Sequence, residues 1–122
     1  MKKRTLLLVV WTLMLLGVLL SPIRPGLIPP LGGFQHWDKV AHFLLFAVTG
    51  FISIYGAGFF SRLWARVLFG LVFGSVLALG TEFGQYFIPF REPDIYDFIV
   101  DLAGLFFGLV FYTLFYLWKQ RI

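Results

Sequence analysis

The sequence predicts an all-α, polytopic membrane protein, a bundle of four transmembrane helices that forms one domain over residues 1–122. Of the residues, 60% are hydrophobic, whereas soluble domains average about 45–50%. The apolar residues also gather in four stretches that are long enough, or nearly so, to cross a hydrocarbon core of roughly 30 Å. These stretches are Thr5–Leu20, Val40–Phe60, Val67–Ile88 and Phe98–Trp118. Too little polar chain is left for a separate soluble domain.

The first stretch follows a basic start, Lys2-Lys3-Arg4, and so resembles the beginning of a signal peptide. The residues after it, Leu19–Arg24, lack a small-x-small cleavage pattern. We therefore expect an uncleaved first helix that serves as an anchor and a packing surface. The segment that follows, Ser21–Trp37, contains four of the six prolines. Because proline breaks helices, we expect an irregular loop there, lying against the membrane interface or capping the bundle.

The second stretch begins with polar side chains. Asp38 is predicted to be the N-cap residue of this helix, because its carboxylate can accept a hydrogen bond from the first turn. Lys39 follows it, and His42 lies four residues after Asp38, one turn deeper on the same face. A histidine inside a membrane helix usually has a partner or a task.

The third stretch has small residues at steps of four, Gly70, Gly74 and Ala78, and Glu82 continues the series. Small residues let membrane helices approach closely, so this stripe is expected to face another helix. Glu82 should then point into the bundle. Gln85, three residues later, shares that face.

The fourth stretch repeats this pattern in reverse. Asp94 and Asp97 lie near its N-terminus, where a helix dipole favours carboxylates. Asp101 lies too far inside the helix to act as a cap, so it needs a buried partner, water or a cation. Asp97, Asp101, Gly104 and Gly108 fall on one face. The stripes of the third and fourth helices are predicted to converge, with small residues at one end and acids at the other.

Acidic residues are confined to one side of the predicted bundle. Charge near a bilayer is costly and is usually functional, so this side is expected to hold a polar pocket. The candidate ligand-binding residues are Asp38, Lys39, His42, Glu82, Gln85, Arg91, Asp94, Asp97 and Asp101. Of these, His42, Glu82 and Asp97 are the candidates for proton transfer.

The basic residues predict the orientation. Seven of the ten lie at the two termini or in the Ser61–Arg66 loop. By the positive-inside rule both termini are expected to be cytoplasmic, in a multi-pass protein of the cell membrane. The net charge of +4 thus reflects topology. It does not indicate nucleic-acid binding, since no basic stripe with interleaved aromatic residues lies outside the membrane stretches.

The chain contains no cysteine, which excludes disulfides and thiolate metal sites. No cofactor is predicted. One alternative is a divalent cation held by Asp38, His42, Glu82 and Asp101, whose nitrogen and oxygen donors suit such an ion. Their spacing matches no known metal motif.

Three motifs resemble the signatures of the VanZ-like family. The first is Asp38-Lys39-x-x-His42-Phe43-x-x-Phe46. The second is Glu82-x-x-Gln85-x-Phe87-x-Pro89-x-Arg91 followed by Asp94-x-x-Asp97, and the third is Asp97-x-x-x-Asp101-x-x-Gly104-x-x-x-Gly108. The resemblance covers residues 38–108. One departure is Asp101, whose position is commonly asparagine in that family, so this chain carries an extra ionisable group.

The resemblance implies a small integral membrane protein of the cell envelope, and the family's named member is associated with resistance to the glycopeptide teicoplanin. It supplies no reaction, so three hypotheses stay open. In the first, the polar site binds a lipid headgroup, a lipid-linked envelope precursor or a glycopeptide. In the second, it is a membrane-embedded acid–base or metal-assisted enzyme acting on an envelope lipid or lipid-linked glycan. In the third, the polar residues lock the helices together or dock a partner. Membrane lipids are the expected partners, and a homo-oligomer is compatible with each hypothesis.

Overall fold

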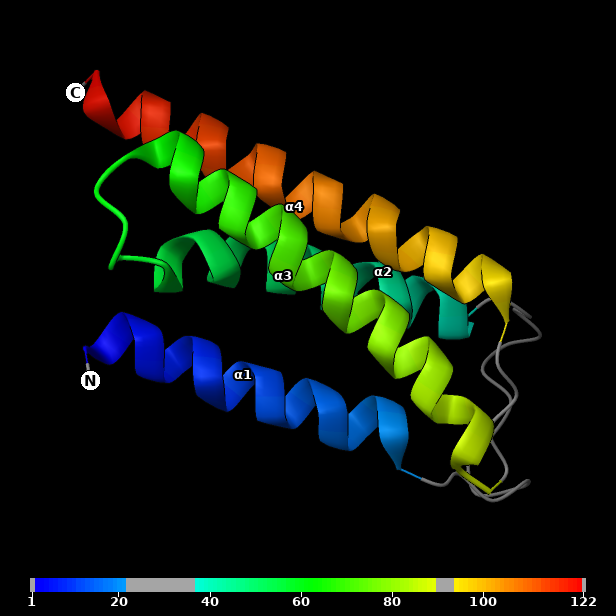
Figure 1. Ribbon diagram of the computed structural model, residues 1–122. Helices are drawn as coiled ribbons and strands as arrows, with labels where there is room; N and C mark the ends of the chain where they lie inside the picture. Colours follow the sequence, from blue (N-terminus) through cyan, green and yellow to red (C-terminus); the bar gives the residue numbers. More distant parts are fainter. Residues whose placement is uncertain (1, 22–36, 90–93, 122) are drawn as a thin grey trace.

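The computed structural model describes residues 2–21, 37–89 and 94–121, and it confirms the all-α, four-helix prediction (Figure 1). All four helices are long and apolar enough to cross a membrane. In chain order they are α1 (Lys3–Leu20), α2 (Trp37–Gly56), α3 (Leu63–Gly84) and α4 (Ile95–Gln120). A short 3-10 helix, η1 (Gln85–Phe87), directly follows α3.

The helices begin before the apolar stretches do. The second helix was predicted to open at Asp38, and it begins at Trp37, with Asp38 and Lys39 inside its first turn. It ends at Gly56, whereas its apolar stretch continues to Phe60. The helices α3 and α4 begin at Leu63 and Ile95, so that a charged residue, Arg66 or Asp97, lies in the first turn of each.

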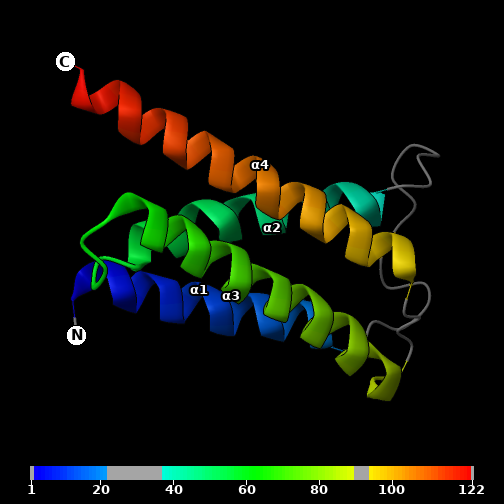
Figure 2. The same cartoon turned by 45° about the horizontal axis from the view of Figure 1, so that its top comes forward.

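The helices run side by side, and both termini lie at the same end as the connection between α2 and α3 (Figure 1). We call this end the basic end, because Arg4, Arg66 and Lys119 lie there. The opposite end, where α2 and α4 begin, is called the acidic end. Turning the molecule shows that α2 lies between α1 and α4 (Figure 2), and it contacts each of the other three helices.

Glycines allow the backbones of α2 and α4 to touch. A Cβ atom built on Gly104 or Gly108 would come closer than 3.0 Å to the carbonyl oxygen of Phe43 or Ala47 on α2. On the α2 side, a Cβ atom at Gly50 would lie 2.5 Å from the carbonyl oxygen of Leu105. Close approach of this kind is how small residues pack membrane helices. The α2–α4 pair is therefore the framework on which the acidic end is built.

The small-residue stripe of α3 is buried as predicted, at Gly70, Gly74 and Ala78. The side chain of Leu105 on α4 fills the space that a Cβ atom at Gly74 would occupy. Glu82 continues the buried face, and its side chain points into the bundle. This packing fixes α3 against α4 and brings its carboxylate to the acidic end.

Hydrogen bonds attach α1 to the bundle. The indole Nε1 of Trp11 donates to Thr49 Oγ1 at 2.8 Å, and Thr5 Oγ1 donates to the carbonyl oxygen of Gly56 at 3.1 Å. Polar contacts of this sort contribute on the order of 1 kcal/mol each between membrane helices. The role predicted for the first helix as a packing surface is consistent with these contacts.

Candidate functional site

Seven polar residues meet at the acidic end, and we call them the polar cluster. Lys39 is at its centre. Its Nζ atom lies 3.1 Å from Asp38 Oδ2, 2.9 Å from Asp94 Oδ2 and 2.5 Å from Asp97 Oδ1. The ammonium group thus joins the start of α2 to the start of α4. The members of the polar cluster are Asp38, Lys39, His42, Glu82, Asp94, Asp97 and Asp101.

His42 lies one turn below Lys39 and is buried. Its Nδ1 is 2.7 Å from Asp101 Oδ1, and its Nε2 is 3.7 Å from Asp97 Oδ2. Asp101 is fully buried, and its side chain is 0% exposed. A carboxylate at one ring nitrogen fixes both the tautomer and the orientation of an imidazole. The second ring nitrogen then faces Asp97 and the ion pairs above it.

Glu82 brings the third helix into the polar cluster. Its Oε1 accepts a hydrogen bond of 2.5 Å from the backbone N–H of Asp94. Its other oxygen, Oε2, and Asp101 Oδ2 are buried and have no hydrogen-bond partner among the described residues. A buried polar atom left unpaired costs about 1–3 kcal/mol. These two oxygens are therefore the buried acceptors of the polar cluster whose hydrogen-bonding capacity the described residues leave unused.

Asp94 is the N-cap residue of α4, as its position near the helix N-terminus predicted. Its Oδ1 accepts a hydrogen bond from the backbone N–H of Tyr96 at 2.9 Å. Its Oδ2 accepts from Lys39, and this bond, with that from Tyr96, lowers the pKa of the Asp94 carboxyl below its ordinary value. Asp94 therefore stays ionised and keeps its contact with Lys39.

The polar cluster contains more acids than bases. It holds five carboxyl groups against one ammonium and one imidazole. The excess is greatest in its interior, where exposure of the side chains falls from 57% at Asp38 to 8% at Asp97 and 0% at Asp101. Such an arrangement favours protons, cations and hydrogen-bond donors as ligands and disfavours free anions.

The structure brings together most of the residues proposed from the sequence. Asp38 is not the N-cap residue of α2: it lies in the first turn, exposed, and pairs with Lys39. Gln85 is buried but turns away from the polar cluster, and its Nε2 donates to the carbonyl oxygen of Leu19 at 2.9 Å. Arg91 lies outside the described residues, as does the Pro-rich loop.

Within the described part of the chain Asp97, Asp101 and His42 are buried and pack against one another. The open polar pocket stays a prediction, because Arg91 of its proposed lining lies outside the described residues. The long side chain of Lys39 reaches back among the carboxylates of Asp38, Asp94 and Asp97. Lys39 was among the candidate residues, but this position was not predicted. Its spacing from Asp94 and Asp97 crosses from α2 to α4, so no pattern along one helix could reveal the contact.

A family model described as VanZ/LLP1 matches residues 4–116 of this chain. The chain belongs to the VanZ/LLP1 family. It is also 34% identical over 85 residues to an uncharacterized protein of Schizosaccharomyces pombe. That match covers 70% of this chain and 51% of the relative, so the chain spans about half the length of the curated protein it matches. No solved structure matches the chain.

In this VanZ/LLP1 protein, the three motifs that carried the resemblance lie together in space. The first supplies Lys39 and His42, the second Glu82, and the third Asp97 and Asp101. The α2–α4 contact through Gly104 and Gly108 sets their spacing. The described charged residues of the three motifs therefore form one polar cluster, to which three helices contribute.

The cation alternative can be compared with this geometry. Among residues 2–21, 37–89 and 94–121, no three histidine or acidic side chains are arranged to hold a metal ion. Of the four residues proposed to hold a cation, Asp38 pairs with Lys39 Nζ at 3.1 Å and His42 pairs with Asp101 at 2.7 Å. The divalent cation stays a prediction.

Proposed function

We propose that this VanZ/LLP1 protein binds the headgroup of an envelope lipid or lipid-linked precursor, or a glycopeptide, through the polar cluster. The observation that supports the proposal is the buried acidic excess with two carboxylate oxygens, Glu82 Oε2 and Asp101 Oδ2, that have no hydrogen-bond partner in the part of the chain that the structure describes. A ligand with ammonium or hydroxyl donors satisfies such atoms. The cluster already accommodates one primary ammonium, that of Lys39.

The proposed direction of entry is from outside the cell. The basic residues at the two termini and in the α2–α3 loop favour a cytoplasmic basic end by the positive-inside rule. The acidic end then faces outward in the plasma membrane. Its rim, formed by Asp38 and Asp94, is exposed, and the buried carboxylates lie one to two turns below. A headgroup at the outer leaflet would meet the rim first.

Glu82→Gln is the first test of this proposal. The change keeps the shape of the side chain and removes its charge. Binding of an ammonium-bearing lipid should therefore weaken by about 10- to 100-fold, from the loss of a charge-assisted hydrogen bond of about 1.5–3 kcal/mol. Binding is measured on purified protein with phosphatidylethanolamine, lipid-linked precursors and teicoplanin as separate probes. Teicoplanin susceptibility of a deletion strain carrying the variant is scored beside membrane abundance.

Thr81→Val provides a matched control. Thr81 is the buried neighbour of Glu82, but its hydroxyl donates only to carbonyls of its own helix, those of Leu77 and Ala78. This variant should bind as the parent does. Unchanged binding of every probe by Glu82→Gln would refute the role of this carboxylate. Loss of membrane abundance in Glu82→Gln, with binding intact in the protein that remains, would favour the purely structural hypothesis.

The orientation of His42 favours one second candidate, a membrane-embedded acid–base enzyme. An imidazole held at Nδ1 by a buried carboxylate, with Nε2 directed toward the rim, is the arrangement of a general base. In this case His42 takes a proton from a hydroxyl of the substrate while Asp101 stabilises the imidazolium. Asp101→Asn tests it: the amide oxygen can still accept from Nδ1 but supplies no charge.

Product formation distinguishes the ligand-binding protein from the acid–base enzyme. An enzyme should convert envelope lipids or lipid-linked glycans, and Asp101→Asn should slow that turnover by about 10²-fold or more while leaving substrate affinity nearly unchanged. A binder gives no product with either protein. Turnover that is indifferent to both Asp101→Asn and His42→Gln would exclude this pair as the acid–base machinery.

A further inference from the structure

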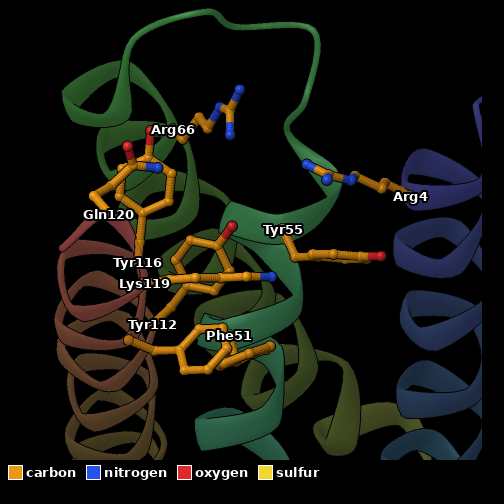
Figure 3. Close-up of a pocket in the computed structure, with 9 residues that line it drawn as sticks. Arg4, Phe51, Tyr55, Arg66, Tyr112, Tyr116, Lys119 and Gln120 are labelled. Carbon is orange, nitrogen blue, oxygen red and sulfur yellow. The ribbon is translucent and has the colours of Figure 1, made fainter. Parts of the chain in front are cut away.

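A second site lies at the basic end, far from the polar cluster. A cavity of about 430 Å³ opens there between the helices (Figure 3). Its cations come from three helices: Arg4 from α1, Arg66 from α3 and Lys119 from α4. In Figure 3, Arg4 and Lys119 reach in from opposite sides, and Lys119 extends across the opening toward Tyr55. Tyrosines from α2 and α4 supply hydroxyl groups around the same space.

The three cations have no acidic partner in the part of the chain that the structure describes. All the ion pairs described belong to the acidic end, where the described acidic side chains, Asp38, Glu82, Asp94, Asp97 and Asp101, are gathered. Instead, Arg4 stacks over the ring of Tyr55 at 4.8 Å, and Arg66 Nε donates to the carbonyl oxygen of Phe60. The cavity therefore has a positive lining whose charge is not compensated within this region.

An apolar groove lies next to this cavity along α2 and α4. It has a volume of about 260 Å³ and is lined by Ala47, Val48, Phe51, Phe107, Gly108 and Phe111. Phe51 belongs to both linings, and its ring packs against that of Tyr112, 4.9 Å between centroids. Phe51 is thus the residue at which a polar, cationic cavity and an apolar groove adjoin.

We propose that this combined site binds an anionic phospholipid of the leaflet at the basic end, with the phosphate between Arg4, Arg66 and Lys119 and an acyl chain over Phe51 in the groove. Charge complementarity selects the phosphate, because basic pockets between transmembrane helices bind anionic headgroups. Because the groove is apolar, it can contact an acyl chain, which a soluble phosphate lacks. The site does not depend on the function proposed for the polar cluster.

Lys119→Gln is the variant that tests this site. The full-length protein is titrated in detergent with phosphatidylglycerol and with phosphatidylcholine of the same acyl chains, and bound lipid is counted by native mass spectrometry. The parent protein should prefer phosphatidylglycerol, and the variant should lose about fivefold of that preference, the effect of one basic residue at an anionic lipid. Arg66→Gln should act in the same direction.

Arg62→Gln is the matched control. Arg62 directly precedes α3 on the same side of the membrane, is exposed and does not line the cavity. Arg62→Gln should leave the preference for phosphatidylglycerol unchanged. If Arg62→Gln reduced this preference as much as Lys119→Gln does, unspecific surface charge would explain it and the site would be overturned. Equal affinity of the parent for glycerol phosphate and for phosphatidylglycerol would overturn the lipid assignment, as would no preference over phosphatidylcholine.

Discussion

Gly108→Ala should destabilise the bundle by about 1–3 kcal/mol, the usual cost of forcing extra volume into a packed core. The added methyl group would come closer than 3.0 Å to the carbonyl oxygen of Ala47, which is backbone and cannot turn aside. Relief requires α2 and α4 to separate, and separation weakens the Lys39 and His42 contacts at the acidic end. A lower melting temperature in detergent is the measurement.

Gly80→Ala is the control that isolates this effect. Gly80 lies on α3, and a Cβ atom built there meets no atom of the described residues within 4 Å. Alanine is the better helix former by about 1 kcal/mol in water, so this variant should be as stable as the parent or slightly more stable. A fall in melting temperature of equal size in both variants would contradict the close α2–α4 contact.

Lys39→Met should have the other large effect. Methionine keeps the apolar length of the side chain but removes the ammonium from among Asp38, Asp94 and Asp97. Breaking a buried pair leaves an uncompensated charge and costs about 3–5 kcal/mol. Because the Lys39 side chain is 23% exposed, water screens part of this loss, and we expect about 2 kcal/mol. Thermal unfolding in detergent measures it.

A second substitution separates charge from packing in this variant. Asp97 is the most buried of the three carboxylates around Lys39, with 8% of its side chain exposed. Adding Asp97→Asn to Lys39→Met removes the charge that was left unpaired, so the double variant should recover part of the lost stability. Asp97→Asn alone lowers the free energy of unfolding by some amount. If adding it to Lys39→Met lowers the free energy of unfolding by that same amount, the two residues are not coupled.

Much of this fold could be predicted because membrane helices have simple rules. A spacing of four residues predicts the small-residue stripe through Gly70 and Gly74, and it is buried. The same spacing predicts the face that carries Asp97 and Asp101, which is buried too. Spacing along one helix also placed Glu82 inside the bundle. The membrane makes such patterns reliable, since each lipid-facing polar group is costly.

The rest depended on contacts between helices that no spacing encodes. Gln85 shares the inward face of α3, yet its amide bonds the Leu19 carbonyl on α1 rather than the polar cluster. Thr49 and Trp11 form a hydrogen bond between α2 and α1 that connects two segments 38 residues apart. Lys39 was predicted as a ligand-binding residue, and in the structure its ammonium lies among the carboxylates of Asp38, Asp94 and Asp97. A flexible four-carbon side chain can turn toward charge in a way that no spacing encodes.

The pairing of α2 with α4 has a consequence for how the protein is made. The second helix enters the membrane carrying Lys39 and His42, and their partners Asp97 and Asp101 belong to α4, which is synthesised after it. Until α4 arrives, α2 must keep its charged end at the membrane surface, where water can solvate it. A nascent chain without α4 lacks Asp97 and Asp101, so Asp38 is the partner of Lys39 that α2 itself supplies.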